Sequence, residues 1–151
     1  MKKFNHTSGR RKRAIARATI FDGNGTILIN SIPLDDYSTN IARMKILEPL
    51  VLAENLKDKV NINVNVYGGG FSAQADAVRL SIAKALVKFS NDKKLRETYL
   101  NYDRNLLIAD VRMAESSKPN DSKPRAKRQK SYRWLVVTPL ISNFNLFRFY
   151  S

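Results

Sequence analysis

The stretch from Val60 to Tyr67 constrains the fold more than any other part of the chain. Its sequence, VNINVNVY, alternates apolar residues at even positions with asparagines at 61, 63 and 65. Because successive side chains of a β-strand point to opposite faces, this pattern gives one apolar face and one polar, uncharged face. We therefore predict a strand whose apolar face lies on the core and whose polar face meets solvent or a partner.

A helix over about residues 72–89 is predicted to follow, after the three glycines that end the strand. Apolar side chains recur there at spacings of three and four, which places them on one buried stripe. Ser72 is expected to cap the start of this helix, and Ser81 is expected to point away from the stripe. The stripe consists of Ala75, Val78, Ile82, Ala85 and Phe89.

A β-hairpin is predicted before the first helix. Residues 14–21 and 26–30 are rich in β-forming side chains. The sequence DGNG at 22–25 lies between them, and Asn and Gly tolerate the positive φ angles of a tight turn. These residues are therefore interpreted as strand, turn and strand.

The other segments of the body complete a two-layer fold. Residues 35–56 predict a helix that Pro49 kinks or divides, and Asp92 is expected to cap a further short helix. Residues 103–112 are interpreted as part strand and part loop. The predicted fold class is α+β, with the helices on one face of the sheet.

Positive charge is concentrated at the two ends of the chain. The 151 residues include 27 Lys and Arg against 13 Asp and Glu, a formal charge of +14. Residues 1–17 hold seven bases and no acid, residues 18–117 hold twelve of each, and residues 118–151 hold eight bases against one acid. A neutral body with two cationic extensions is typical of a nucleic-acid-binding protein. No basic amphipathic helix accompanies these charges, so no membrane partner is expected.

The composition disfavours catalysis and metal binding. The chain has no cysteine and a single histidine, His6, which lies in the cationic N-terminal segment. Disulfides, thiolate ligands, two-histidine metal sites and a histidine-based triad are therefore not expected. No cofactor, metal site or enzymatic activity is predicted. The start of the chain lacks the apolar run of a signal peptide, so a location inside the cell is expected.

The run YGGGFSAQADAVR, residues 67–79, resembles a phosphate-binding loop at the start of a helix. It matches neither of the two common glycine motifs of nucleotide-binding proteins. A strand-to-helix turn that needs positive φ at Gly68, Gly69 or Gly70 is the simpler interpretation. If the run does bind an anion, an RNA phosphate is favoured over a nucleotide.

The N-terminal bases are candidates for phosphate contacts. Arginine offers phosphate a planar, bidentate fork, whereas lysine acts as a point charge. The segment SGRRKRAIAR at 8–17 contains no carboxylate, which favours a nucleic-acid partner over a merely solvated charge run. The candidates are Arg10, Arg11, Lys12, Arg13 and Arg17.

The segment after Met113 loses its apolar periodicity and is rich in Ser, Pro and bases. Such a segment cannot offset its ordering entropy alone and is expected to stay extended until it binds. Tyr132 stands among bases, as a stacking group does in proteins that bind single-stranded RNA. A disordered tail that only aids solubility is the alternative. The candidate bases are Lys123, Arg125, Lys127, Arg128, Lys130 and Arg133.

Four of these stretches, in this order, resemble one family. SGRRKRAIARATI, GTILIN, GGGFSAQADAVR and RAKRQKSYR are similar to the S-nine family of small-subunit ribosomal proteins, in its archaeal and eukaryotic branch. The resemblance extends from about residue 3 to residue 133. It implies a mostly antiparallel sheet under helices, like the second domain of ribosomal protein S-five, with a left-handed βαβ crossover.

The resemblance also implies partners and contact residues. The partners would be small-subunit ribosomal RNA, the peptidyl-site tRNA and neighbouring ribosomal proteins of the subunit head, in cytoplasmic ribosomes. Contacts with ribosomal RNA would come from the N-terminal bases, from the glycine run and from Lys123, Arg125, Lys127 and Arg128. The residues near tRNA would be Lys130, Ser131, Tyr132 and Arg133.

The expected organisation has four parts. A basic arm (1–13) precedes a globular RNA-binding domain (14–112), an extended basic tail (113–133) and an atypical apolar extension (134–151). The resemblance implies a chain end at Arg133, so the extension has three possible origins or roles. It could come from translation past the usual stop or a misread gene end, it could dock on another ribosomal protein, or it could fold back on the body.

Two other functions stay open at this stage. A free-standing basic protein that coats DNA or RNA would have the same charge distribution. A nucleotide-dependent transferase would use the glycine run to hold phosphates. Binding of a nucleotide at micromolar concentration would indicate the transferase, and a stable association with small ribosomal subunits would indicate the ribosomal protein.

Overall fold

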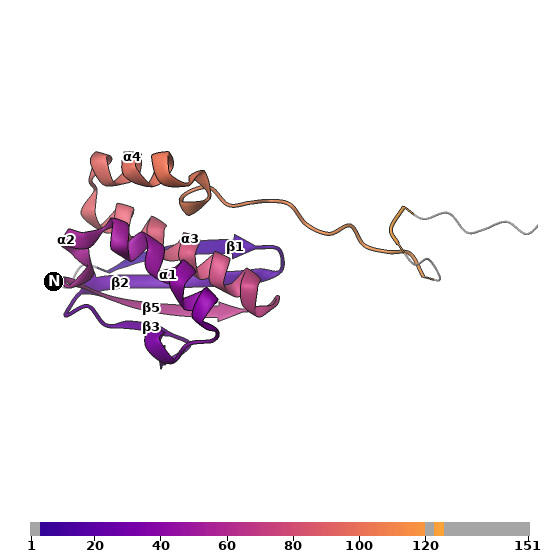
Figure 1. Ribbon diagram of the computed structural model, residues 1–151, viewed down its shortest axis with the longest axis horizontal. Helices are drawn as coiled ribbons and strands as arrows, with labels where there is room; N and C mark the ends of the chain where they lie inside the picture. The colour runs from indigo at the N-terminus through magenta and orange to yellow at the C-terminus, as the bar shows by residue number, and fades with distance from the viewer. Residues whose placement is uncertain (1–3, 120–122, 126–151) are drawn as a thin grey trace, which may run out of the picture. The chain divides into compact units, whose positions relative to one another are not determined.

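Five strands form one mixed sheet in the order β1-β2-β5-β3-β4 (Figure 1). The computed structural model describes residues 4–119 and 123–125, and it divides into a first unit, Met1–Met113, and a second unit, Ala114–Ser151. Three of the four strand pairings are antiparallel and β3–β5 is parallel, which confirms the predicted mostly antiparallel sheet. The strands are β1 Asn5–Arg11, β2 Ala14–Asp22, β3 Ile27–Ile29, β4 Ile32–Pro33 and β5 Val60–Tyr67.

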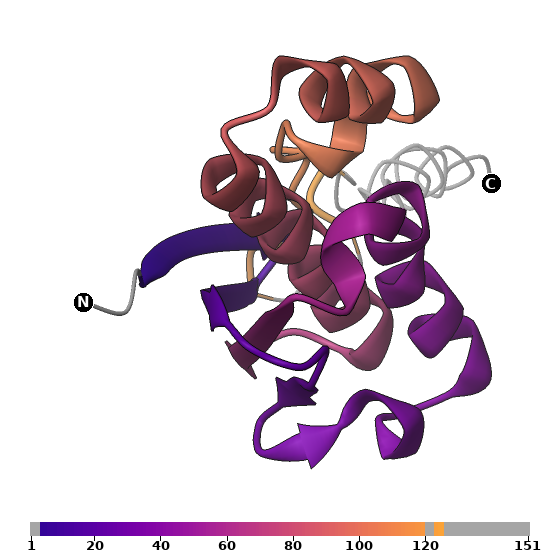
Figure 2. The same ribbon diagram turned by 90° about the vertical axis from the view of Figure 1, so that its left-hand side faces the viewer.

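The helices form a second layer on one side of the sheet (Figure 2). Helix α3 packs directly on β1, β2 and β5, α1 packs beside α3, and α4 contacts both of these helices. The predicted two-layer α+β class is therefore confirmed. The helices are α1 Asn40–Leu52, α2 Glu54–Lys57, α3 Phe71–Ser90 and α4 Lys93–Tyr102, with 3-10 turns η1 Leu34–Asp36 and η2 Arg104–Leu106.

The connection from β3 through α1 to β5 is left-handed. The two strands are adjacent and parallel. In Figure 1, β5 runs to the right above β3 while α1 returns in front of the sheet. About 98% of such crossovers are right-handed. The family resemblance predicts this rare hand, whereas the apolar periodicity of the sequence carries no information about it.

The core lies between β2, β5 and the helices. Every second residue of β5 from Val60 to Val66 is buried, as predicted from the alternation. The inward residues of β2 are mainly alanines, from Ala14 to Ala18, followed by Ile20. Small side chains on this strand let α3 lie close to the sheet, and Ile82 and Leu86 of α3 are fully buried there.

Residues 23–25 form a bend after β2, but the predicted hairpin is wrong. Strands β2 and β3 are not paired with each other, because β5 lies between them. Asn61 Oδ1, on β5, accepts hydrogen bonds from the backbone N–H groups of Asn24 (2.8 Å) and Thr26 (3.0 Å). These bonds hold the turn across the start of β5. The turn residues predict a reversal of the chain, but they do not say which strand becomes the neighbour.

The predicted N-terminal arm is largely a strand. Residues 5–11 pair with β2 along their whole length, so residue 13 is not a boundary between an arm and a globular domain. Thr7 donates a hydrogen bond to the carbonyl of Ser81 (2.8 Å), and Ser81 is fully buried rather than turned away from the core. This packing could not be predicted from apolar periodicity, because β1 carries few apolar residues.

The outer edge of β1 is covered by two lysines of α3. Lys84 Nζ lies 3.4 Å from the carbonyl oxygen of Ser8, and Lys88 Nζ lies 3.3 Å from that of His6. A sheet edge normally presents unpaired backbone groups to any passing strand. Here the ammonium groups of Lys84 and Lys88 donate hydrogen bonds to two of the carbonyl groups on this edge.

The helix boundaries differ in part from the predictions. Helix α1 begins at Asn40 and passes through Pro49, and the chain breaks at Ala53 instead. The cap of α4 is confirmed, because Asp92 accepts a hydrogen bond from the N–H of Lys94 at 2.9 Å. In the described part of the chain, residues 103–112 contain the turn η2 and loop but no strand, so the strand predicted there is wrong.

Tyr99 links α4 to α1 inside the core, and its removal has a testable effect. Its hydroxyl donates a 2.6 Å hydrogen bond to the carbonyl of Pro49, and burial raises the pKa of Tyr99. We expect Tyr99→Phe to lower the free energy of unfolding by about 1–2 kcal/mol, because a buried carbonyl loses its donor.

The same variant should change the alkaline stability profile. Since the pKa of Tyr99 is higher in the folded than in the unfolded chain, its contribution is complete below pH about 10 and is lost as the pH rises toward the folded value. Urea unfolding of both proteins between pH about 8 and 11 measures this. The difference in free energy of unfolding between wild type and Tyr99→Phe should narrow as the pH rises. A difference that stays constant over this range would contradict a raised pKa of Tyr99 in the folded chain.

Candidate nucleic-acid interface

Two of the predicted RNA-binding segments meet at one end of the sheet. The turn between β1 and β2 contains Lys12, with φ of +52°, and Arg13. A Cβ atom added at Gly68 would lie 2.6 Å from the carbonyl oxygen of Arg13, so the glycine run passes directly over this turn. We call this group the turn cluster. Its members are Arg10, Lys12, Arg13, Gly68, Gly69 and Gly70.

The glycines of the turn cluster are required by the backbone. Gly68 and Gly69 have φ angles of +73° and +66°, a region that other residues rarely adopt. They reverse the chain between β5 and α3, as the simpler interpretation of the run predicts. Helix α3 begins at Phe71 with Gly70 as its N-cap, so the predicted cap at Ser72 is wrong. The glycine at this position leaves the first turn of α3 without a side-chain cap.

The bases of the turn cluster are exposed to solvent. Arg10, Lys12 and Arg13 are all exposed, and none of them forms an ion pair with another described residue. Arg17 is exposed as well, but it lies on the uncovered face of the sheet, with its guanidinium carbon 5.7 Å from the ring centroid of Tyr67. These side chains are therefore accessible to phosphate.

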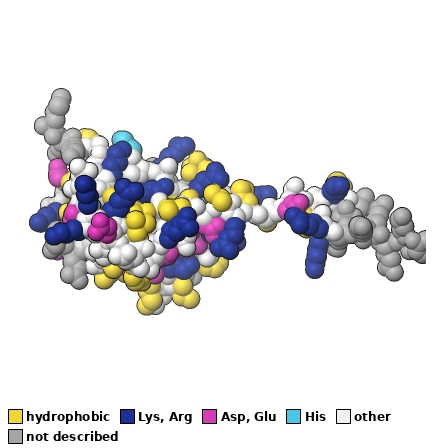
Figure 3. Space-filling model, turned by 90° about the horizontal axis from the view of Figure 1, so that it is seen from above, with side chains coloured by type: hydrophobic (Ala, Val, Ile, Leu, Met, Phe, Trp, Pro, Cys, Tyr) yellow, Lys and Arg dark blue, Asp and Glu magenta, His cyan; other side chains and the backbone are white. Residues whose placement is uncertain are grey.

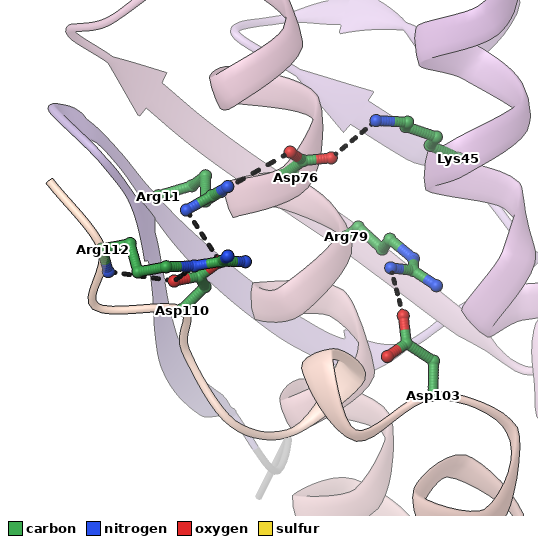
Figure 4. A network of polar contacts seen from close by, with 7 residues as sticks. All are labelled: Arg11, Lys45, Asp76, Arg79, Asp103, Asp110 and Arg112. Atoms are coloured by element: carbon green, nitrogen blue, oxygen red, sulfur yellow. Dashed lines mark hydrogen bonds and ion pairs between the residues drawn. The ribbon is translucent and has the colours of Figure 1, made fainter. Parts of the chain in front are cut away.

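Arg11 differs from its neighbours because its charge is matched inside the protein (Figure 4). Its guanidinium lies 3.0 Å from Asp110 and 3.8 Å from Asp76. Asp110 also accepts hydrogen bonds from the side chain and the backbone of Arg112. These bonds from Arg112, together with the charge of Arg11, hold the pKa of Asp110 well below its usual range. Residue spacing does not predict this contact, because it joins residues far apart in the chain.

A second group of ion pairs fixes α3 to the segment that follows α4. Arg79 of α3 pairs with Asp103 at 2.9 Å and also with Glu48 of α1. Lys45 of α1 pairs with Asp76 at 3.0 Å. Together with the Arg11–Asp110 pair, these contacts bring residue 110 to the end of β1, beside the β1–β2 turn (Figure 4).

The second unit contains the remaining predicted contact residues. Lys123 and Arg125 are exposed, and Arg125 Nε lies 2.9 Å from Glu115. Both partners of this pair face solvent, where an ion pair contributes little to stability. The other candidates of this unit lie outside the described residues: Lys127, Arg128, Lys130, Ser131, Tyr132 and Arg133.

The described residues form neither a metal site nor a membrane-spanning helix. Within 4–119 and 123–125, no three side chains of His, Asp or Glu gather in a way that could hold a metal ion. None of the described helices is long and apolar enough to span a bilayer. Sequence reasoning missed Tyr67, whose ring is half exposed beside Arg17. The only indication was its position as the last residue on the polar side of the β5 alternation.

Comparisons with known proteins find relatives of one family along most of the chain. The family model described as Ribosomal protein S9/S16 matches residues 9–133. Two proteins named small ribosomal subunit protein uS9, from strains C7 and C5 of Methanococcus maripaludis, are each 45% identical over 130 residues. These alignments cover 85% of this chain and 97% of each relative. Residues 134–151 lie beyond the matched region.

The extent of these matches decides the family. The matched region contains the end of β1, the other four strands, the helices, the turn cluster and the basic part of the second unit. The predicted family resemblance is thereby confirmed. The chain belongs to the ribosomal protein S9/S16 family, whose members are structural proteins of the ribosome and not enzymes.

Proposed function

We propose that this chain, a structural constituent of the small ribosomal subunit, binds ribosomal RNA through the turn cluster and the bases of the second unit. The observation that carries the proposal is that several acids of the first unit are paired with bases, whereas the bases of the turn cluster are not paired with any described acid. The acids Asp76, Asp103 and Asp110 are paired with bases of the first unit. The bases of the turn cluster are exposed and have no described acidic partner. The charge at the turn cluster is therefore positive and accessible.

The surface of the first unit supports this proposal. Figure 3 shows one face, on which Lys and Arg side chains are spread widely and outnumber the acidic side chains among them. Phosphate contacts supply most of the affinity of such interfaces and release bound counterions. Arg11 stays a predicted contact, but a phosphate there would compete with Asp110 for its guanidinium. Arg10, Lys12, Arg13 and Arg17 meet no such competition from the described acids.

The finer part of the proposal concerns tRNA. By family resemblance, Lys130, Ser131, Tyr132 and Arg133 reach the peptidyl-site tRNA, and the protein works in cytoplasmic ribosomes. Two bases around a tyrosine are suited to phosphate binding combined with stacking. Neighbouring ribosomal proteins of the subunit head are further proposed partners.

Small subunits that carry Lys130→Ala together with Arg133→Ala test the two parts of the proposal in one experiment. We expect the variant protein to sediment with the subunit after a high-salt wash, because the turn cluster and the rest of the tail are intact. Retention of peptidyl-site tRNA should fall about tenfold, since two phosphate contacts are lost. Sucrose gradients and filter binding of labelled tRNA measure these quantities.

Each part can fail separately. Wild-type protein that leaves the particle at moderate salt would contradict the structural role and favour the free-standing basic coat protein. Loss of assembly in the double variant, before any loss of tRNA, would contradict the tRNA-facing role. The matched control is Lys93→Ala with Arg96→Ala, which removes two exposed bases of α4 and should affect neither measurement.

A further inference from the structure

One face of the sheet carries no helix. Helices α1, α3 and α4 all lie on the other side (Figure 2). The register aligns the residues of the uncovered face in rows across the strands. Arg10 stands opposite Ile15, which stands opposite Tyr67, and in the next row Ser8, Arg17 and Asn65 are aligned. We call this surface the open face, formed by the outward residues of β1, β2 and β5.

The open face combines aromatic, amide and cationic groups. Tyr67 is 49% exposed, and the Arg17 guanidinium lies over its ring at 5.7 Å. Asn63 and Asn65 are exposed, and their side chains form no hydrogen bond with any described residue. None of the outward residues of these three strands is acidic: His6, Ser8 and Arg10 on β1, Ile15, Arg17, Thr19 and Phe21 on β2, and Asn61, Asn63, Asn65 and Tyr67 on β5.

A shallow hollow lies on this surface over β1 and β2, and Asn65 of β5 borders it. It has a volume of about 470 Å³, and Arg17, Asn65 and His6 contribute to its lining. His6 Nδ1 lies 3.0 Å from Thr19 Oγ1, which fixes the imidazole at one wall. At the far end of the same face, the rings of Phe4 and Phe21 pack at a centroid distance of 5.8 Å.

These groups match the chemistry of an unpaired nucleotide. Bases stack on aromatic rings and on guanidinium planes, and amide side chains can both donate to and accept from a base edge. A regular RNA duplex keeps its base faces stacked inside the helix, so it cannot use Tyr67 in this way. The positive charge and the absence of outward carboxylates on these strands favour RNA over an average protein surface.

We propose that the open face binds an unpaired segment of ribosomal RNA, with a base stacked at Tyr67 and Arg17 and with Asn63 and Asn65 hydrogen-bonded to base edges. This inference rests on the proposed binding of ribosomal RNA. It adds a base-contacting surface to the phosphate-contacting turn cluster, and Arg10 belongs to both.

Tyr67→Leu tests the proposal in the full chain. The probes are a short single-stranded oligoadenylate and an RNA duplex of the same length. Loss of the ring should weaken binding of the single strand about ten- to one-hundredfold and leave binding of the duplex within about twofold. The dependence of the affinity on salt should not change, because no phosphate contact is lost. Arg17→Gln, in contrast, should lower the salt slope by about 1, because it removes a positive charge that attracts the neighbouring phosphates as well as a stacking plane.

The control variant is Tyr102→Leu, because Tyr102 is 58% exposed on α4, in the opposite layer. It should bind both probes like the wild type. Thermal unfolding of the two leucine variants verifies that each is folded. Ultraviolet crosslinking of the single strand should label the peptide of residues 60–79, which contains Tyr67.

Three outcomes would overturn the inference while the proposed function stands. These are equal single-strand affinity of Tyr67→Leu and wild type, crosslinks confined to residues 118–133, and attachment of a photoreactive residue at position 67 to protein rather than RNA in intact subunits. Failure of the wild-type chain to bind either RNA probe would instead contradict the proposed function itself.

Discussion

Neutralising five bases of the second unit is expected to lower the affinity for ribosomal RNA by about 10³-fold at about 0.1 M salt. The variant replaces Lys118, Lys123, Arg125, Lys127 and Arg128 with glutamine and leaves the tRNA-proximal Lys130 and Arg133 unchanged. Each base that meets a phosphate contributes about 0.7 to 0.9 to the slope of log K against log salt. The slope should therefore become shallower by about 4. Filter binding to a transcript of the small-subunit head RNA, over a range of salt concentrations, measures both quantities.

The body of the protein offers a matched control. Lys57, Lys59, Lys93, Lys94 and Arg96 are exposed bases away from the turn cluster, and the same replacement there changes the net charge equally. If the second unit meets phosphates directly, this control should alter the slope by less than about 1. An equal loss in both variants would mean that only total charge matters, and the proposed tail contacts would be wrong.

Replacing Gly9 with alanine is expected to destabilise the first unit by about 3 kcal/mol. A Cβ atom at this position would collide with the carbonyl oxygen of Ala77 and lie 2.8 Å from the amide nitrogen of Ser81. Both are backbone atoms of α3, so no side chain can move aside to make room. Overpacking of this kind costs about 1–3 kcal/mol, occasionally more, and the rigid contact places this variant at the upper end. Thermal unfolding should show a midpoint lower by about 10 °C.

The same substitution at Gly70 serves as the control. A Cβ atom there would meet nothing within 4 Å, and the φ angle of −106° suits alanine. Its cost should stay within about 1 kcal/mol, mainly because alanine is a poor N-cap. If both variants unfold at the same temperature, β1 does not pass α3 as closely as described. Wild-type stability of Gly9→Ala would have the same meaning.

Local sequence patterns predicted the elements that depend only on residues close together in the chain. The alternation in β5 and the cap at Asp92 depend on residues a few positions apart, and both predictions are confirmed. Strand β1 was missed because its core contact uses a glycine and a threonine rather than apolar side chains. The hairpin prediction failed because Asn61, which is distant in sequence, holds the turn across β5.

The sequence predicted which residues belong to the candidate site, but not that these residues lie close together in the fold. The N-terminal bases and the glycine run were identified separately, and only the fold brings Arg13 against Gly68. The pairing of Arg11 with Asp110 could not be predicted, since nothing in sequence spacing links positions at opposite ends of a domain. The open face was anticipated only as a polar side of one strand. Its aromatic and cationic members come from the neighbouring strands.

The lysines over β1 have a consequence for the protein before it joins a particle. The opposite edge of the sheet, β4, is only two residues long and includes Pro33. Neither border of the sheet is therefore a good template for another copy of the chain. In a newly synthesised molecule that has not yet bound RNA, the edges of this sheet are therefore poor starting points for fibril growth. The molecule's net charge of +14 instead attracts it to any polyanion. Such non-specific binding depends on how soon the protein meets its ribosomal RNA, and not on how it folds.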